Sequence, residues 1–380
     1  MGFHHGTLHC TGESRRVAPQ QRAASIAMSA QLPAQVDRHN LVAVLRAMIA
    51  AAESIARERL HRRTAHPAGI PLELWFDDAA DADLAAARLA DLAPGKTATR
   101  RARLYTLSSG TIGCDRLPSW SDDACDPGTF HAILAEAKFR AAHPFHRQLW
   151  LAFDEATGIG VQLARSPADR PVWFAGAPLR HHLHWLLRAR GRRIAHAASL
   201  GRDGRGILLV GHGGAGKSGT MLAGVAAGLQ TVGDDYVALS GLDPAVAQPL
   251  FRIVKQDGAG LARIAGLAER LAHLPLNWMN KVEFDPTTIF PGCFADALRI
   301  GAIVVPRLAH ATIPRFAPAT PGEAMRMLMR TNLYQYPGEA DDGLAYYAAL
   351  MRSLPVRHFD LSDQAADNGA ALVEFTATLG

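Results

Sequence analysis

The stretch RGILLVGHGGAGKS, residues 205–218, decides the fold. Its first half contains a continuous apolar run, which is typical of a strand buried on both faces of a sheet. Its second half has the spacing G-x-x-x-x-G-K-S, and the small apolar residues that follow up to Leu229 predict a helix. Glycines let the backbone curl so that its N–H groups face an anion, and the helix adds its positive end. This strand–loop–helix order predicts a phosphate-binding loop.

The residues of this loop have separate expected roles. Lys217 is expected to reach the β- and γ-phosphate oxygens of a bound nucleotide, and the Ser218 hydroxyl to ligate Mg²⁺. The sequence therefore predicts ATP and Mg²⁺ as cofactors. The residues expected to surround the phosphates are Gly211, Gly213, Gly214, Ala215, Gly216, Lys217, Ser218 and Gly219.

Two adjacent carboxylates, Asp234 and Asp235, follow the loop, the first of them 17 residues after Lys217 (234 − 217). This separation suits one helix and a return to the sheet. A phosphoryl-transfer site needs a carboxylate for Mg²⁺, and a hydroxyl acceptor needs a second one to orient or deprotonate it. Neighbours on a regular strand point to opposite faces, so both acids can serve one site only where the strand is irregular. A solvated acidic turn is the alternative interpretation.

A single histidine precedes the strand that leads into the loop. His196 lies 21 residues before Lys217 (217 − 196), among small apolar residues. Such a histidine, taken alone, is as consistent with a hydrogen-bonded core residue as with a site residue.

Composition excludes several classes of protein. The chain has 380 residues, of which 48% are hydrophobic and 20% charged, which predicts two or three folded domains. The net charge is +5, but aromatic residues make up only 7% and lie mostly apart from the arginines, so a nucleic-acid partner is not expected. The four cysteines form no C-x-x-C pair, and no apolar segment reaches the ~18 residues of a membrane span. These features predict a cytoplasmic protein without a membrane partner.

The hydrophobic pattern divides the chain into three predicted parts. Residues 1–65 are a loose segment followed by a helix over 36–63, and residues 66–175 form a small α+β domain. In that domain we expect a helix at 130–142 and a strand at 172–174. Residues 176–380 form an α/β domain around the loop, with a second strand at 231–239. His181, His182 and His184 share a predicted helix at 179–190, where a solvated or packing face is favoured over a metal site because no further ligand is evident.

The combination of His196, the glycine-rich loop and the Gly-Asp-Asp-Tyr-Val stretch at 233–237 resembles the catalytic domain of HPr kinase/phosphorylase. It is most similar to the shorter HPr-kinase-like proteins of peptide and natural-product gene clusters, including lasso-peptide kinases. The resemblance covers about residues 170–365 and is strongest from 176 to 239. It implies an α/β fold with a mixed sheet around a phosphate loop, related to ATP-dependent phosphoenolpyruvate carboxykinase. It also implies a kinase that acts on a serine hydroxyl and is often oligomeric.

The resemblance also implies roles for single residues. Asp234 would orient the acceptor hydroxyl as the base, Asp235 would hold Mg²⁺ together with Ser218, and His196 would lie near the transferred phosphate. HPr kinases have a glutamate downstream of the aspartates, whereas this chain has Lys255 there, with Asp257 as the nearest acid.

Lysines near that place are candidates for neutralising charge on the γ-phosphate. Lys255 and Lys281 could both do so, and an ordinary surface charge is the equal alternative for each. The predicted function is transfer of the γ-phosphate of ATP to a serine or threonine hydroxyl of a protein or peptide. The alternatives are a non-catalytic ATP-binding sensor or scaffold and a small-molecule kinase. The predicted catalytic residues are Asp234, His196, Lys217 and Lys255.

Overall fold

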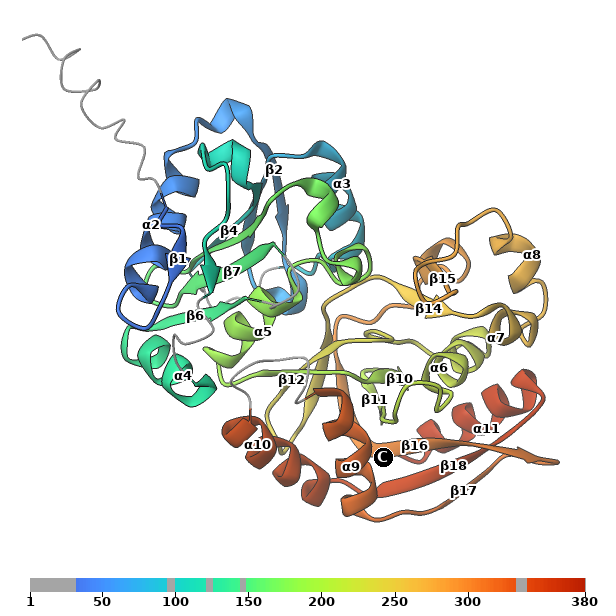
Figure 1. The fold of residues 1–380 in the computed structure, drawn as a ribbon. Helices are drawn as coiled ribbons and strands as arrows, with labels where there is room; N and C mark the ends of the chain where they lie inside the picture. Colours follow the sequence, from blue (N-terminus) through green and yellow to red (C-terminus); the bar gives the residue numbers. More distant parts are fainter. Residues whose placement is uncertain (1–31, 94–99, 121–125, 144–147, 333–339, 380) are drawn as a thin grey trace, which may run out of the picture. The chain divides into compact units, whose positions relative to one another are not determined.

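Two β-sheets with helices on their faces make up most of the chain in the computed structural model (Figure 1). The structure describes residues 32–379 apart from 94–99, 121–125, 144–147 and 333–339. The predicted loose lead-in over residues 1–31 lies outside the described residues. The mixed α/β class expected from the sequence is confirmed, while the predicted domain boundaries at 65/66 and 175/176 stay predictions.

The first sheet has the strand order β2-β3-β4-β8-β7-β6. Its central strands β3, β4 and β8 are parallel, and β2, β7 and β6 are added antiparallel. Helix α2 contacts β8, and helix α3 contacts β2 and β3. The bounds are β2 (His61–Ala65), α3 (Ala79–Arg88), β3 (Leu72–Phe76), β4 (Ala102–Ser108), α4 (Pro127–Glu136), β6 (Phe139–Ala142), β7 (Leu149–Asp154) and β8 (Ile159–Ala164), with α2 (Leu41–Ser54) and the pair β1 (Gln35–Val36) and β5 (Ser119–Trp120) outside the sheet.

The second sheet has the strand order β10-β11-β16-β13-β12-β9, and β18 pairs with both β16 and β17. Strand β16 is long and lies parallel to β11 and β18 but antiparallel to β13. The bounds are β9 (Arg193–Ala195), β10 (Ala198–Arg202), β11 (Arg205–Leu209), β12 (Val237–Ser240), β13 (Val246–Pro249), β16 (Leu298–Ala311), β17 (Arg315–Pro318) and β18 (Val356–Ser362).

Helices cover this sheet, and a small strand pair stands beside it (Figure 1). Helix α6 contacts α11 and β10, and α9 contacts α10 and β16. Strands β14 and β15 pair antiparallel next to α7 and α8. The bounds are α5 (Arg180–Arg188), α6 (Lys217–Ala226), β14 (Val254–Gln256), α7 (Gly258–Ala262), α8 (Leu267–Leu271), β15 (Val282–Phe284), α9 (Pro321–Asn332), α10 (Ala340–Ser353) and α11 (Ala365–Ala377).

An interruption in the second sheet positions the candidate site. The segment from β9 to β10 runs antiparallel to the segment from Gln230 to β12. The two segments pair at both ends but not in the middle. At one end β9 pairs with β12, and at the other the N–H of Ser199 donates to the carbonyl of Gly233 at 3.0 Å. We call the unpaired middle, residues 196–197 and 234–236, the ladder gap. Because Leu209 pairs with Ala198, strand β11 ends beside this gap.

Several expected elements are wrong in type or extent. The helix predicted over 36–63 is broken at Ile55, because residues 61–65 pair with β3 as strand β2. The helix predicted over 130–142 ends at Glu136, and after Lys138 adopts φ 56° the chain continues as β6. The strand predicted at 172–174 is a 3₁₀ turn, and the strand predicted at 231–239 begins only at Val237.

The histidines of α5 pack in the interior, so of the solvated and packing faces that the sequence left open, the packing face is the one present. All three are buried, and His182 Nε2 lies 3.2 Å from the carbonyl oxygens of both Ala152 and Val161. Burial lowers the pKa of His182 to about 4, so the ring is neutral near pH 7. Within the described residues, no cluster of three or more His, Cys, Asp or Glu side chains could hold a metal ion.

Candidate functional site

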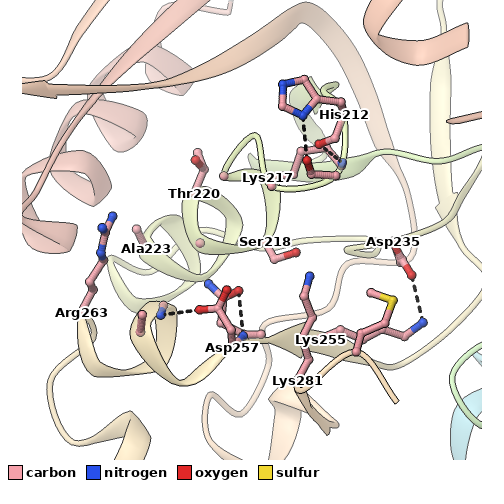
Figure 2. A pocket seen from close by; sticks show the side chains of 18 of the residues that line it. His212, Lys217, Ser218, Thr220, Ala223, Asp235, Lys255, Asp257, Arg263 and Lys281 are labelled. Carbon is pink, nitrogen blue, oxygen red and sulfur yellow. Dashed lines mark hydrogen bonds and ion pairs between the residues drawn. The ribbon is translucent and has the colours of Figure 1, made fainter. Parts of the chain in front are cut away.

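A cavity of about 500 Å³ opens along the predicted phosphate loop, residues 211–218 (Figure 2). This volume lies in the range of small-molecule and cofactor sites. In Figure 2, Ser218 lies between Ala223 and Arg263 on one side and Asp235 and Lys255 on the other. The cavity therefore has two ends with the N-terminus of α6 between them.

The predicted phosphate loop curls as its glycines allow. Gly214 and Gly216 have φ of 83° and 92°, values that side chains rarely tolerate, and Gly216 directly precedes α6. The Lys217 ammonium donates hydrogen bonds to the carbonyls of Gly211 at 2.8 Å and His212 at 3.3 Å. Burial lowers the pKa of Lys217, while the nearby Asp235 and Asp234 act to raise it. A buried cation held by two backbone carbonyls is suited to exchange them for phosphate oxygens.

Asp234 is buried at the ladder gap, with 4% of its surface exposed. Its Oδ2 accepts from the Lys255 N–H at 3.3 Å, and its buried Oδ1 accepts no hydrogen bond of normal geometry from the described residues. Burial and the charge of Asp235 raise its pKa to about 6, although the Ser218 hydroxyl and the Lys255 N–H act to lower it. Asp234 Oδ1 is thus a buried carboxylate oxygen without a hydrogen bond of normal geometry, and the carboxylate lies near the Ser218 hydroxyl. Two such oxygens are suited to bind a cation.

Asp235 faces the cavity and is held by two partners. Its Oδ1 lies 3.0 Å from His196 Nε2, and its Oδ2 lies 3.0 Å from Lys255 Nζ. Burial acts to raise its pKa, but the interactions with His196 and Lys255 hold the pKa well below its usual value. The two neighbouring acids therefore have opposite electrostatic environments: Asp235 is ionised at any physiological pH, whereas Asp234 takes up a proton as the pH falls through about 6.

Lys255 stands opposite Glu283 across the β14–β15 pair. Their side chains approach to 4.0 Å, and the Lys255 side chain is 14% exposed. Gly176 leaves room for this pair, since a Cβ there would lie 2.5 Å from Lys255 Cε and 3.0 Å from Glu283 Oε1. Of the two interpretations, Lys255 is thus a cavity residue in an ion pair rather than a surface charge. Besides Asp235, Glu283 is an acidic side chain next to Lys255.

The structure brings most of the predicted site residues together. Gly213, Gly214, Gly216, Lys217, Ser218, Gly219, His196, Asp235, Lys255 and Lys281 line the cavity. Gly211 and Ala215 shape the loop, because a Cβ on Gly211 would lie 2.8 Å from the Cβ of Ala215. Asp257 also lines the cavity, where it caps α7 by accepting from the Gly260 N–H at 2.7 Å.

Other cavity residues were not expected from the sequence. The Arg180 guanidinium donates to the Tyr236 hydroxyl at 2.9 Å and lies 4.7 Å from the Trp173 ring centroid. Trp278 and Met279 also line the cavity. Two large apolar residues between asparagines, at 277–280, were the signal that sequence reasoning passed over.

Comparisons with known proteins add little to this geometry. No family model matches the chain. No curated protein matches it either. Among solved structures, the chain is similar to the Hpr(Ser) kinase/phosphatase from Coxiella burnetii, with 14% identity over 49% of this chain and 93% of that one, at a TM-score of 0.27. A likeness of that size carries no argument about fold or function. In the part of the chain that the structure describes, no helix is long and apolar enough to cross a membrane.

Proposed function

We propose that this protein is an ATP- and Mg²⁺-dependent kinase that transfers the γ-phosphate to a serine or threonine hydroxyl of a protein or peptide. One observation carries the proposal: a strand–loop–helix with a buried lysine opens into a cavity that also holds Asp235, His196 and Lys255. A phosphoryl-transfer site needs this combination of phosphate cradle, cations and carboxylates. The resemblance to HPr-kinase-like proteins supports the same conclusion.

The contacts favour a division of labour between the two acids. Asp234 lies beside Ser218 and keeps one buried oxygen without a hydrogen bond of normal geometry, so these two residues fit a Mg²⁺ ion. When bound, Mg²⁺ would neutralise charge on the β- and γ-phosphate oxygens. Asp235 faces the cavity next to His196, where an acceptor hydroxyl can reach it. This proposal exchanges the roles that the family resemblance implies for Asp234 and Asp235.

The reaction then follows from the positions of the side chains. The acceptor oxygen attacks the γ-phosphorus, its O–H proton passes to the Asp235 carboxylate, and the bond from the γ-phosphorus to the bridging oxygen breaks to release ADP. Lys217 and Lys255 contribute positive charge next to the transferred group. Lys255 must leave Asp235 to do so, and Glu283 at 4.0 Å is available as its other partner.

A direct assay tests the proposal. The full-length protein is incubated with Mg-ATP and a peptide library that contains serine or threonine, and products are examined by mass spectrometry for an added phosphate. We expect a product with the wild type and at least a hundredfold less with Asp235→Asn, since one uncharged amide replaces the proton acceptor. The proposal fails if no peptide or protein is ever phosphorylated, or if Asp235→Asn is as active as the wild type.

The same variant separates the kinase from a non-catalytic sensor. A sensor needs only ATP binding, so Asp235→Asn would retain its biological activity as long as titration calorimetry shows normal affinity for Mg-ATP. If the protein is a kinase, Asp235→Asn would lose its biological activity even though its affinity for Mg-ATP is normal.

A further inference from the structure

Large apolar side chains are exposed on a short segment at the rim of the cavity. Leu276, Trp278 and Met279 are 61%, 63% and 42% exposed. Single exposed apolar residues are ordinary, but several within four positions are typical of a binding surface. Trp278 and Met279 also line the cavity, which makes the exposed patch continuous with the candidate reaction centre.

The segment is an ordered turn. The Asn277 side-chain oxygen accepts from the N–H groups of Met279 at 2.8 Å and Lys281 at 3.1 Å, and the Asn277 N–H donates to the Lys281 carbonyl at 2.8 Å. A bridge between Leu276 and Val282 closes its base. We call residues 277–281 the Asn277 turn. Its hydrogen bonds fix the direction in which Trp278 and Met279 are presented.

The Asn277 turn is also tied to the reaction centre. Asn277 Nδ2 donates to Glu283 Oε1 at 2.8 Å, and Glu283 stands opposite Lys255 on the neighbouring strand. Lys255 in turn pairs with Asp235. The β14–β15 strand pair therefore sets the distance from Trp278 and Met279 to Asp235.

The position of the rim decides what can cover it. The end of the cavity at Ala223 and Arg263 lies on the other side of Ser218 from Asp235 and Lys255, and it suits the nucleoside of a nucleotide whose phosphates lie at the loop. Asn277, which precedes Trp278, donates to Glu283, and Glu283 stands opposite Lys255. The Asn277 turn therefore belongs to the opposite end of the cavity, where Figure 2 shows Asp235 and Lys255. A small acceptor that fills the polar space near Asp235 would leave the rim exposed. A polypeptide covers it with a side chain next to its hydroxyl, since one extended residue spans about 3.3–3.6 Å.

We propose that Trp278 and Met279 dock a bulky apolar side chain of a polypeptide acceptor, within about two residues of the hydroxyl that receives the phosphate. This inference rests on the proposed function and narrows its substrate class. Aromatic side chains at the centre of an interface contribute most of the binding energy, so Trp278 is the dominant contact.

The test uses a series of serine peptides that differ only at the two positions on each side of the serine. With the wild-type protein, peptides with a flanking Leu or Trp are expected to have a kcat/KM about tenfold higher than those with Ala or Ser. In Trp278→Ala this preference is lost through a KM about tenfold higher, as expected for truncation of an interface anchor. The kcat and the affinity for Mg-ATP stay unchanged. Ile313→Ala is the control, because Ile313 is 75% exposed but lies on another segment and is not a cavity residue, and it should behave like the wild type.

Several outcomes overturn the inference. Phosphate transfer without any preference for apolar flanking residues refutes it while leaving the kinase proposal intact. An unchanged peptide KM in Trp278→Ala, together with a change of oligomeric state by light scattering, would assign the rim to a second copy of the chain. Absence of transfer to every peptide refutes the proposed function itself, and this inference with it.

Discussion

Asp234→Asn is expected to make the protein more stable at neutral pH. The pKa of Asp234 is raised from 3.8 to about 6, first by burial and then by the charge of Asp235, so the folded state holds this carboxylate ionised at a cost. A difference of one pKa unit corresponds to about 1.36 kcal/mol, so above pH 7 the raised pKa lowers the free energy of unfolding by about 3 kcal/mol. An asparagine of similar shape removes the charge while its carbonyl can still accept from the Lys255 N–H. With an unfolding entropy of about 2.1 cal/mol/K per residue over roughly 350 residues, the melting temperature would rise by roughly 4 °C.

The pH dependence of this gain has a fixed sign. Because the folded-state pKa is the higher one, the folded protein takes up the proton first as pH falls, and the cost of the charge decreases through pH 6 toward 4. The advantage of Asp234→Asn should therefore be about half as large at pH 5 as at pH 7.5. Melting curves without nucleotide, in EDTA, measure it at both values. A variant that is no more stable at pH 7.5, or whose advantage grows on acidification, refutes the reasoning.

Asp235→Asn provides the matched control for the neighbouring acid. Its pKa is held well below the usual value by His196 and Lys255, so removing its charge breaks the ion pair with Lys255 and weakens the contact with His196, and it should lower the melting temperature at pH 7.5. Opposite thermal shifts for two adjacent, isosteric substitutions would be hard to explain by anything but their surroundings.

Three further predictions concern other parts of the structure. Lys217→Met removes the ammonium expected to contact the phosphates. Titration calorimetry should show Mg-ATP binding weakened by about 10- to 150-fold, because a hydrogen bond to a charged group contributes about 1.5–3 kcal/mol. An unchanged affinity would contradict the nucleotide site. Gly176→Ala is compatible with the backbone at φ −102° but places a Cβ 2.5 Å from Lys255 Cε, which displaces the end of that side chain. We expect kcat to fall about tenfold with Mg-ATP affinity intact, and a normal kcat would show that this position of the Lys255 ammonium is not needed for transfer. Tyr347→Phe deletes the 2.6 Å hydrogen bond from the buried Tyr347 hydroxyl to the Ile194 carbonyl. The free energy of unfolding measured in urea should fall by about 1 kcal/mol. A decrease under about 0.3 kcal/mol, roughly the error of such a measurement, would contradict a stabilising role for this hydrogen bond.

The sequence predicted best what depends on local pattern. Strand β11, the glycines after it and the start of helix α6 were expected within a residue, because a buried apolar run and a helix of small residues each have a distinct periodicity. The helix ends at Ala226, three residues before the predicted end at Leu229. Strand β2 was missed because its His-Arg-Arg-Thr sequence has no apolar alternation, and pairing with β3 makes it a strand.

For the site, the residue types could be predicted but not their contacts. The sequence indicated that two adjacent acids need an irregular strand, and the ladder gap supplies that irregularity next to Gly233 with φ 153°. The pairing of His196 with Asp235, and of Lys255 with Glu283, depends on which strands become neighbours, which no spacing along the chain reveals. The roles given to Asp234, Asp235, His196 and Lys255 stay predictions until activity is measured.

The ladder gap separates the proposed site residues from the strand pairing that holds the sheet together. His196, Asp234 and Asp235 lie where β9–β10 and the strand opposite them exchange no regular pairing, while strand pairs on both sides fix the positions of the two chains. A side chain in such a place can be exchanged, or can move during a reaction cycle, without shifting the register of its neighbours. The scaffold should accordingly tolerate new combinations of side chains at these positions, which makes it a practical starting point for redirecting the chemistry by design.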